Sequence, residues 1–300
     1  MYKQISYFLG MFLIITFLPI ITSAQNDSLR TKIERIVEEA QGNVGAAIIG
    51  IENKDTLTVN GDKIFPMQSV YKFPLALAVL NQVDKGNLSL DQKIFVKKKE
   101  LLPNTWSPLR EKYPNGNVNI TLDEILTFTV TMSDNNGCDI LFKLLGGPKK
   151  VNDLIHSIGI KDIAIMATEE EMHKDWEVQF TNWCTPYAMG QLLSLFYQSE
   201  ILSVKSTEYL IQTMVKTTTG TKRIKGFLPA GTTVAHKTGS SGRNDAGVIG
   251  ALNDAGIVTL PNRNHFAIVV FISNSTAEES VCEKVIAEIA KAVWDWNLGH

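Results

Sequence analysis

Ser69 and Lys72 stand three positions apart, at a place where the pattern predicts that a helix begins. Residues three apart on a helix lie on the same face, so the amine would reach the hydroxyl. Backbone N–H groups near a helix start also favour developing negative charge on a serine oxygen. The pair is therefore a candidate nucleophile with an amine that handles its proton. The spacing alone is weak evidence, since a chain of this length contains about one Ser-x-x-Lys by chance.

Two further short motifs accompany this pair. A Ser-Asp-Asn tripeptide begins at Ser133, after an expected helix over residues 123–132, and a Lys-Thr-Gly tripeptide begins at Lys237, at the end of an expected strand. All three motifs occur together by chance in only about a few chains per thousand. A Thr-Gly pair at the end of an edge strand presents backbone N–H groups, and the lysine adds positive charge for a carboxylate.

The three motifs together resemble those of class A serine β-lactamases and penicillin-binding proteins. The resemblance to the class A enzymes spans essentially the whole mature chain, and within that class the sequence looks like the extended-spectrum branch of PER and VEB types. It implies an α+β fold of the serine β-lactamase and DD-peptidase kind. One domain would be a three-layer α/β/α sandwich with an antiparallel five-stranded sheet, and the other would be all-helical.

The resemblance also implies a role for each matching residue. Ser69 would be acylated, Lys72 would handle its proton, and Ser133 would pass a proton to the departing lactam nitrogen. The backbone N–H groups of Ser69 and Ser240 would form the oxyanion hole. Lys237 would bind the substrate carboxylate, helped by Thr238 or Ser240. The other expected substrate-binding residues are Asn135 for the side-chain amide, Gly239, and Trp106 as an aromatic wall at the cleft mouth.

The base that activates water for deacylation is expected on a loop with the family pattern Glu-x-x-Leu-Asn. The corresponding stretch here is Glu169-Glu170-Glu171-Met172-His173. Aligning Met-His with Leu-Asn makes Glu169 the base, with His173 beside the substrate in place of asparagine. Glu170 and Glu171 are expected to be solvated charges.

Two other positions depart from the family pattern. The Arg–Asp ion pair that usually braces this loop is matched by Ala167 and Asn182, so the loop must be held differently. We expect a wider cleft that admits cephalosporins with bulky oxyimino side chains. Arg223, fourteen residues before Lys237, is expected to be a second carboxylate-binding cation; the alternative is a surface arginine in a basic stretch.

Residues 1–24 have the pattern of a secretory signal peptide: Lys3, then an apolar stretch from residue 5 to 21, then small residues up to Ala24. The mature chain would begin at Gln25, be free of the membrane and lie in the periplasm.

The mature chain alternates between helical and strand patterns. We expect helices over 27–41 and after Ser275 or Thr276, strands over 44–52, 56–60, 232–237, 247–252 and 266–272, and mainly helix from 69 to 214. Loops are expected over 103–119 and 167–183. The predicted domains are 25–65 with 215–300, and 66–214, with the site between them.

Composition excludes several classes of protein. Lys and Arg total 29 against 31 Asp and Glu, which argues against a nucleic-acid binder. The five histidines have no metal-ligand spacing, and the three cysteines form no CxxC pair. We therefore expect no metal and no cofactor, and we also expect free buried thiols and a monomer. The resemblance implies that the partner is a small β-lactam.

The resemblance implies hydrolysis of penicillins and cephalosporins, including oxyimino-cephalosporins, through a serine acyl-enzyme, which confers antibiotic resistance. Two alternatives share the three motifs: a D-Ala-D-Ala peptidase, and a sensor domain that stays acylated. The loop that carries Glu169 favours the hydrolase over both.

Overall fold

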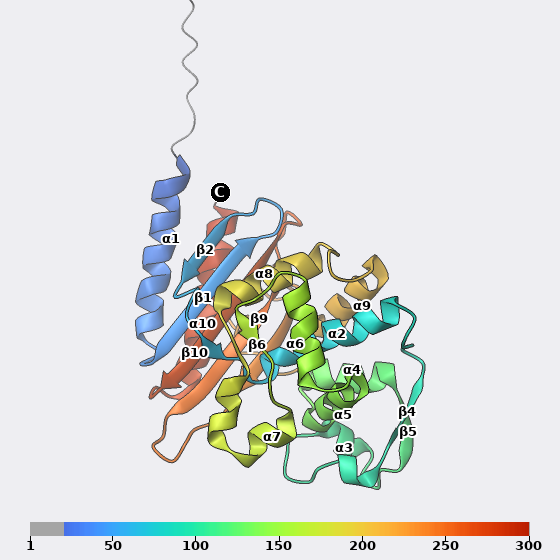
Figure 1. Cartoon of the computed structure of the whole chain (residues 1–300). Coiled ribbons are helices and arrows are strands. Elements are labelled where there is room, and N and C mark those ends of the chain that lie inside the picture. The colour runs from blue at the N-terminus through green and yellow to red at the C-terminus, as the bar shows by residue number, and fades with distance from the viewer. Residues whose placement is uncertain (1–20, 300) are drawn as a thin grey trace, which may run out of the picture.

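The computed structural model describes residues 21–299, with side chains from residue 28 onward. Its central sheet has five strands in the order β2-β1-β10-β9-β8, and all neighbours are antiparallel (Figure 1). Two strands come from the N-terminal part of the chain and three from the C-terminal part, so both ends build one sheet. The strands are β1 (Asn43–Gly50), β2 (Thr56–Val59), β8 (Val234–Ser240), β9 (Ile249–Thr259) and β10 (His265–Ser275).

Apolar side chains are buried on both faces of the sheet, because helices cover both faces. Successive strand residues point to opposite faces. On β10, Phe266 and Ile268 belong to the core shared with the terminal helices, whereas Ala267 and Val269 belong to the core on the other side. The terminal helices α1 (Ile21–Glu38) and α10 (Glu279–Leu298) lie against each other, and α8 (Pro186–Tyr197) packs on β1 and β10 (Figure 1). The predicted three-layer sandwich with a five-stranded antiparallel sheet is confirmed.

Four of the helices between β2 and β8, namely α4, α5, α6 and α9, pack around α2, which is buried from Lys72 through Leu80. A helix that is apolar almost all round belongs at the centre of a lobe. The other helices are α3 (Pro108–Lys112), α4 (Leu122–Thr131), α5 (Asn135–Leu145), α6 (Pro148–Ser157), α7 (Glu169–Lys174) and α9 (Val204–Val215), and α2 itself spans Lys72–Asp84. Short 3-10 turns η1 (Gln68–Tyr71), η2 (Lys98–Glu100) and η3 (Trp176–Thr181) lie between them, with strands β3 (Phe65–Pro66), β4 (Lys93–Val96), β5 (Val118–Thr121), β6 (Ile163–Ala164) and β7 (Trp183–Cys184).

Several predicted element boundaries were wrong. The strand expected over 247–252 continues to Thr259, because its polar residues find buried partners: Asn253 Nδ2 donates to Pro66 O at 2.7 Å, and Asp254 Oδ1 lies 2.9 Å from His236 Nδ1. The loop expected over 103–119 contains α3, where Ser107 Oγ accepts the Arg110 N–H. The loop expected over 167–183 contains α7 and η3.

Most of the predicted signal peptide, residues 1–20, lies outside the described residues. The helix expected over 27–41 begins earlier and ends at Glu38, and it runs past the predicted cleavage point after Ala24. From residue 21 to residue 299, no helix is both long and apolar enough to cross a membrane. Cys138, Cys184 and Cys282 are free and buried, as predicted.

Candidate active site

Ser69 lies in η1, immediately before α2 begins at Lys72. Lys72 is fully buried, and its Nζ donates a hydrogen bond to Ser69 Oγ at 2.9 Å. Gln68, the residue before the serine, has φ of +48°, a left-handed conformation that is uncommon for residues other than glycine. Backbone strain of this kind persists only where the surrounding structure imposes it. The turn therefore holds the Ser69 hydroxyl against the buried amine.

Lys72 Nζ is the centre of a group of oxygen atoms from three different elements. It donates to Asn135 Oδ1 at 2.6 Å and to Ser133 O at 2.8 Å, and Ser133 Oγ lies at 3.5 Å. Glu169 Oε1 lies 2.9 Å away as an ion-pair partner, although its alignment is not that of a hydrogen bond. The predicted residues Ser69, Lys72, Ser133, Asn135 and Glu169 thus meet around one ammonium group.

Asp134 explains how Ser133 and Asn135 come to face Lys72. Its carboxylate is fully buried and accepts hydrogen bonds from Gly137 N at 2.7 Å and Leu109 N at 2.6 Å. These bonds cap α5 and tie it to α3. Burial raises the pKa of Asp134, and the hydrogen bonds offset part of that effect. Ser133 has φ of +60°, so the backbone turns sharply between α4 and α5. The middle residue of the motif is therefore structural, and its neighbours are left free to project.

Lys237 on β8 reaches the same group from the other side. Its Nζ donates to Ser133 Oγ and to Thr238 O, both at 2.9 Å. Complete burial, and then the nearby charge of Lys72, hold the pKa of Lys237 well below its ordinary value. The negative charge of an anion entering the site would favour the protonated amine and raise this pKa.

Gly239 lets β8 lie directly against η1. A Cβ on this residue would come within 2.5 Å of Met67 O and 3.1 Å of Ser69 N, so any other residue would force the strand away. Next to it, Thr238 Oγ1 lies 2.6 Å from Thr219 Oγ1. Gly239 therefore allows β8 to lie close to the backbone of Ser69.

Arg223 is not a surface arginine, so that alternative is excluded. It is 5% exposed and lies behind β8, where it donates to Gly239 O at 3.2 Å, to Asn253 O at 3.0 Å and to Ser240 Oγ at 2.7 Å. Glu283 Oε1 on α10 lies 3.5 Å from its Nε. The guanidinium thus adds positive charge beside Ser240, and its expected role as a carboxylate-binding cation stays a prediction.

The three adjacent glutamates have different environments. Glu169 faces Lys72, whereas Glu170 pairs at the surface with Lys174 at 3.0 Å. Glu171 was expected to be a solvated charge, and this was incomplete: its carboxylate accepts from Thr168 N at 2.8 Å in a capping box that begins α7. The box fixes the register of the helix, and this register turns Glu169 inward.

The loop around α7 is held without an Arg–Asp ion pair. Asn182 is fully buried, and its Oδ1 accepts from Met166 N at 2.7 Å and Ala167 N at 2.9 Å, while its Nδ2 donates to Ala167 O at 2.9 Å. Asp139 on α5 accepts from Glu169 N at 2.8 Å and Glu170 N at 2.9 Å. Burial and then the Glu169 charge raise the pKa of Asp139 to about 7. Side-chain amide and carboxylate groups here replace the missing ion pair.

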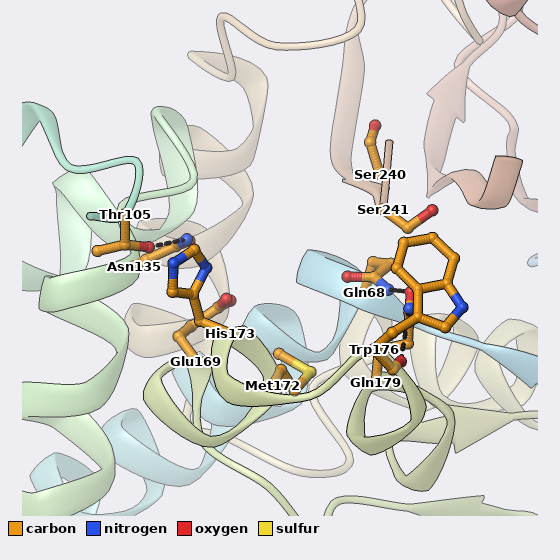
Figure 2. A pocket seen from close by; sticks show the side chains of 10 residues that line it. All are labelled: Gln68, Thr105, Asn135, Glu169, Met172, His173, Trp176, Gln179, Ser240 and Ser241. Atoms are coloured by element: carbon orange, nitrogen blue, oxygen red, sulfur yellow. Dashed lines mark hydrogen bonds between the residues drawn. The ribbon is translucent and has the colours of Figure 1, made fainter. Parts of the chain in front are cut away.

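A cavity of about 330 Å³ opens beside this group (Figure 2). It contains the predicted residues Asn135, Glu169, His173 and Ser240, and six that sequence reasoning missed: Gln68, Thr105, Met172, Trp176, Gln179 and Ser241. Gln68 stands next to Ser69, and Met172, Trp176 and Gln179 lie in the Glu169 loop. Their places beside a motif or in that loop are the signal that could have identified these four.

Trp106 does not line this cavity. It is 57% exposed, and its Nε1 donates to Met132 O at 2.8 Å. Its predicted contact with substrate stays a prediction. Trp176 is the aromatic residue that does line the cavity.

Within residues 21–299, no group of three or more His, Cys, Asp or Glu side chains could hold a metal ion. His236, next to Lys237, is fully buried and paired with Asp254. Its side chain is therefore packed on the face of the sheet away from the cleft, as the alternation of side chains along the strand predicts.

Comparison with known proteins gives a consistent result. The model of the Beta-lactamase enzyme family matches residues 28–297. The chain is 46% identical to Beta-lactamase VEB-1 of Pseudomonas aeruginosa over 99% of both chains, and 41% identical to Extended-spectrum beta-lactamase PER-1 of the same organism over 95% of this chain and 92% of that one. It is similar to the solved structure of TLA-1 extended spectrum Beta-lactamase, with a TM-score of 0.90 and 58% identity, over 91% of this chain and 99% of that one.

Proposed function

The chain belongs to the Beta-lactamase enzyme family, and from that premise we propose that it hydrolyses penicillins and cephalosporins through an acyl-enzyme on Ser69. The observation that carries the proposal is the position of Lys72 Nζ, 2.9 Å from both Ser69 Oγ and Glu169 Oε1. A nucleophile and a carboxylate on either side of one amine supply groups for both making and breaking an ester. This activity confers resistance to the antibiotics it destroys.

Acylation begins when Lys72 gives a proton to Glu169 and becomes able to accept the proton of Ser69. The Ser69 oxygen then attacks the lactam carbonyl carbon, and the bond to the ring nitrogen breaks. That nitrogen takes a proton from Ser133 Oγ, which Lys72 replaces across the 3.5 Å between them. Glu169 returns its proton to Lys72, so the charges are restored when the ester has formed.

The substrate is held by charge at one end and by an amide at the other. Its carboxylate binds Lys237, helped by Thr238 and by the positive field of Arg223, and its side-chain amide binds Asn135. The lactam oxygen lies between the N–H groups of Ser69 and Ser240, which would stabilise the oxyanion. The close approach at Gly239 supports this arrangement, because it brings the two segments together.

Deacylation uses Glu169 as the base. Its carboxylate takes a proton from a water molecule, the oxygen attacks the ester carbonyl, and Ser69 leaves with a proton returned to it. His173 lines the same cavity and would help to orient substrate and water. This step separates the hydrolase from a peptidase or a sensor domain, in which the ester with a β-lactam persists.

Oxyimino-cephalosporins are the proposed extended substrates. The relatives described as extended-spectrum support this, as does a loop held by Asn182 and Asp139 in place of an ion pair.

We also propose that the chain is cleaved after Ala24, is exported to the periplasm and is a monomer. We propose that it has two domains, one made of residues 25–65 with 215–300 and the other of residues 66–214. The sheet built from both chain ends supports that division.

Turnover of a chromogenic cephalosporin by the purified mature protein tests the proposal, with the covalent species followed by mass spectrometry. We expect rapid multiple turnover in the wild type and no acylation in Ser69→Ala. A single stoichiometric burst with a persistent Ser69 adduct would instead identify a peptidase or a sensor.

A further inference from the structure

Trp176 is the first residue of η3, and its indole forms one wall of the cavity beside Ser69. Figure 2 shows it next to Ser241 and Gln68, across the cavity from Asn135 and Thr105. It comes from the loop that carries Glu169, yet it lies against the end of the sheet. The indole therefore spans the gap between the loop and β8.

Gly250 on β9 makes room for the ring. A Cβ at this position would lie 2.8 Å from Trp176 Cζ2 and 2.9 Å from Ser241 Oγ, so any other residue would displace the indole. Phe180, in the same loop, packs edge-on against the indole, with the two ring centroids 6.3 Å apart. The ring is thus seated between the sheet and its own loop.

The backbone of Trp176 is tied to the residue before the nucleophile. Gln179, which is 4% exposed, donates from Nε2 to Trp176 O at 2.7 Å. The Oε1 of the same side chain accepts a hydrogen bond from Gln68 Nε2. Because Gln68 precedes Ser69, the indole is held at a fixed place relative to the reacting oxygen before any ligand arrives. Preorganisation of this kind lowers the entropic cost of binding.

The position of the ring indicates which part of a ligand it meets. In the proposed function, on which this inference rests, Lys237 holds the carboxylate and Asn135 the amide, so the acyl side chain extends past Asn135 into the cavity. The remaining lining there is largely polar, and Met172 and Trp176 are its large apolar members. A fixed indole and a thioether favour a flat, polarisable ring over a flexible chain.

We propose that Trp176 is a specificity-determining residue that stacks on an aromatic or heteroaromatic ring in the acyl side chain of the β-lactam. The preferred substrates are then those whose acyl group carries such a ring within reach of Gly250 and Ser241. Trp176 takes no part in the bond-breaking steps, so it acts on substrate selection and not on the chemistry at Ser69.

Two penicillins with the same nucleus provide the test, one with a phenylacetyl and one with a straight hexanoyl side chain. We expect Trp176→Ala and Trp176→Leu to lower the ratio of their kcat/KM values about fivefold, mostly through KM for the aryl substrate, since aromatic pairing adds about 0.5–1.5 kcal/mol beyond buried area. Trp176→Phe should keep the ratio near that of the wild type. Phe95→Ala, which removes a 52% exposed aromatic ring on β4, is the matched control and should not move it.

Gly250→Ala gives a second test that leaves the indole in the chain. It should lower the ratio as Trp176→Leu does, and the double variant should show no further change. An unchanged ratio in Trp176→Leu, or equal losses for both substrates, would overturn the inference while hydrolysis itself continued. If the wild type hydrolysed neither penicillin, the proposed function would fail first, so the two failures are distinguishable. A fold defect would lower activity on the hexanoyl substrate as well, and thermal melting would reveal it.

Discussion

Replacing Asp139 with asparagine should change how stability depends on pH, because this buried carboxyl holds the Glu169 loop. Asp139 accepts the N–H groups of Glu169 and Glu170, and burial and the Glu169 charge raise its pKa from 3.8 to about 7. The folded state therefore holds the proton more tightly than the unfolded state. The contribution of Asp139 to the free energy of unfolding is complete below about pH 4 and is lost as the pH rises toward 7.

The size of the effect follows from the shift. About three pKa units at about 1.4 kcal/mol each give an upper limit near 4 kcal/mol, of which about 3 kcal/mol falls between pH 5 and pH 8. The measurement is the free energy of unfolding by urea at pH 5, 6, 7 and 8, for wild type and Asp139→Asn at constant ionic strength. The difference, wild type minus variant, should fall by up to about 3 kcal/mol across this range.

Asp153→Asn is the control for this experiment. Its surface partner Lys149 lowers the pKa of Asp153, so this carboxyl titrates below the tested pH range. The difference in the free energy of unfolding between wild type and Asp153→Asn should therefore not change from pH 5 to pH 8. A difference for Asp139→Asn that stayed flat or rose with pH would show that the folded state does not hold this proton more tightly.

Three other substitutions test separate parts of the structure. Asn182→Ala removes the three hydrogen bonds to the backbone that hold the Glu169 loop, so we expect the free energy of unfolding in urea to fall by about 2–3 kcal/mol and proteolysis near residue 167 to become faster. Unchanged proteolysis would show that Asn182 does not hold the loop. Lys237→Ala should raise KM for benzylpenicillin about 10- to 100-fold with a smaller change in kcat, and an equal fall in kcat would contradict a binding role. Phe271→Ala in the core should lower the free energy of unfolding by about 3–5 kcal/mol, and a loss below about 1 kcal/mol would contradict its burial.

The sequence predicted the sheet and the motif-bearing residues because local patterns carry that information. Strand alternation located the strands on both sides of the helical region, and the three motifs located Ser69, Ser133 and Lys237. Tertiary contacts explain what was missed in the sheet. β9 continues through Asn253 and Asp254, whose side chains disfavour strands when exposed but are paired here with Pro66 and His236.

The loop could be predicted only in part, because its partners are distant in sequence. Asn182 could be recognised as a departure from the family pattern, but its bonds to Met166 and Ala167 require the fold. Trp176 was missed because no motif contains it; the signal was an aromatic residue seven positions after the predicted base. Its place in the cavity depends on Gly250, a contact between residues far apart in the chain.

Trapping the acyl-enzyme would show which of the three adjacent glutamates is the base for deacylation. The Glu169→Gln variant is mixed with a chromogenic cephalosporin and followed by intact-protein mass spectrometry, with Glu170→Gln and Glu171→Gln as matched variants. The proposed mechanism predicts a stable adduct on Ser69 in Glu169→Gln alone and continued turnover in the other two. Turnover by Glu169→Gln at the wild-type rate, or a stable adduct only in Glu170→Gln or Glu171→Gln, would contradict it.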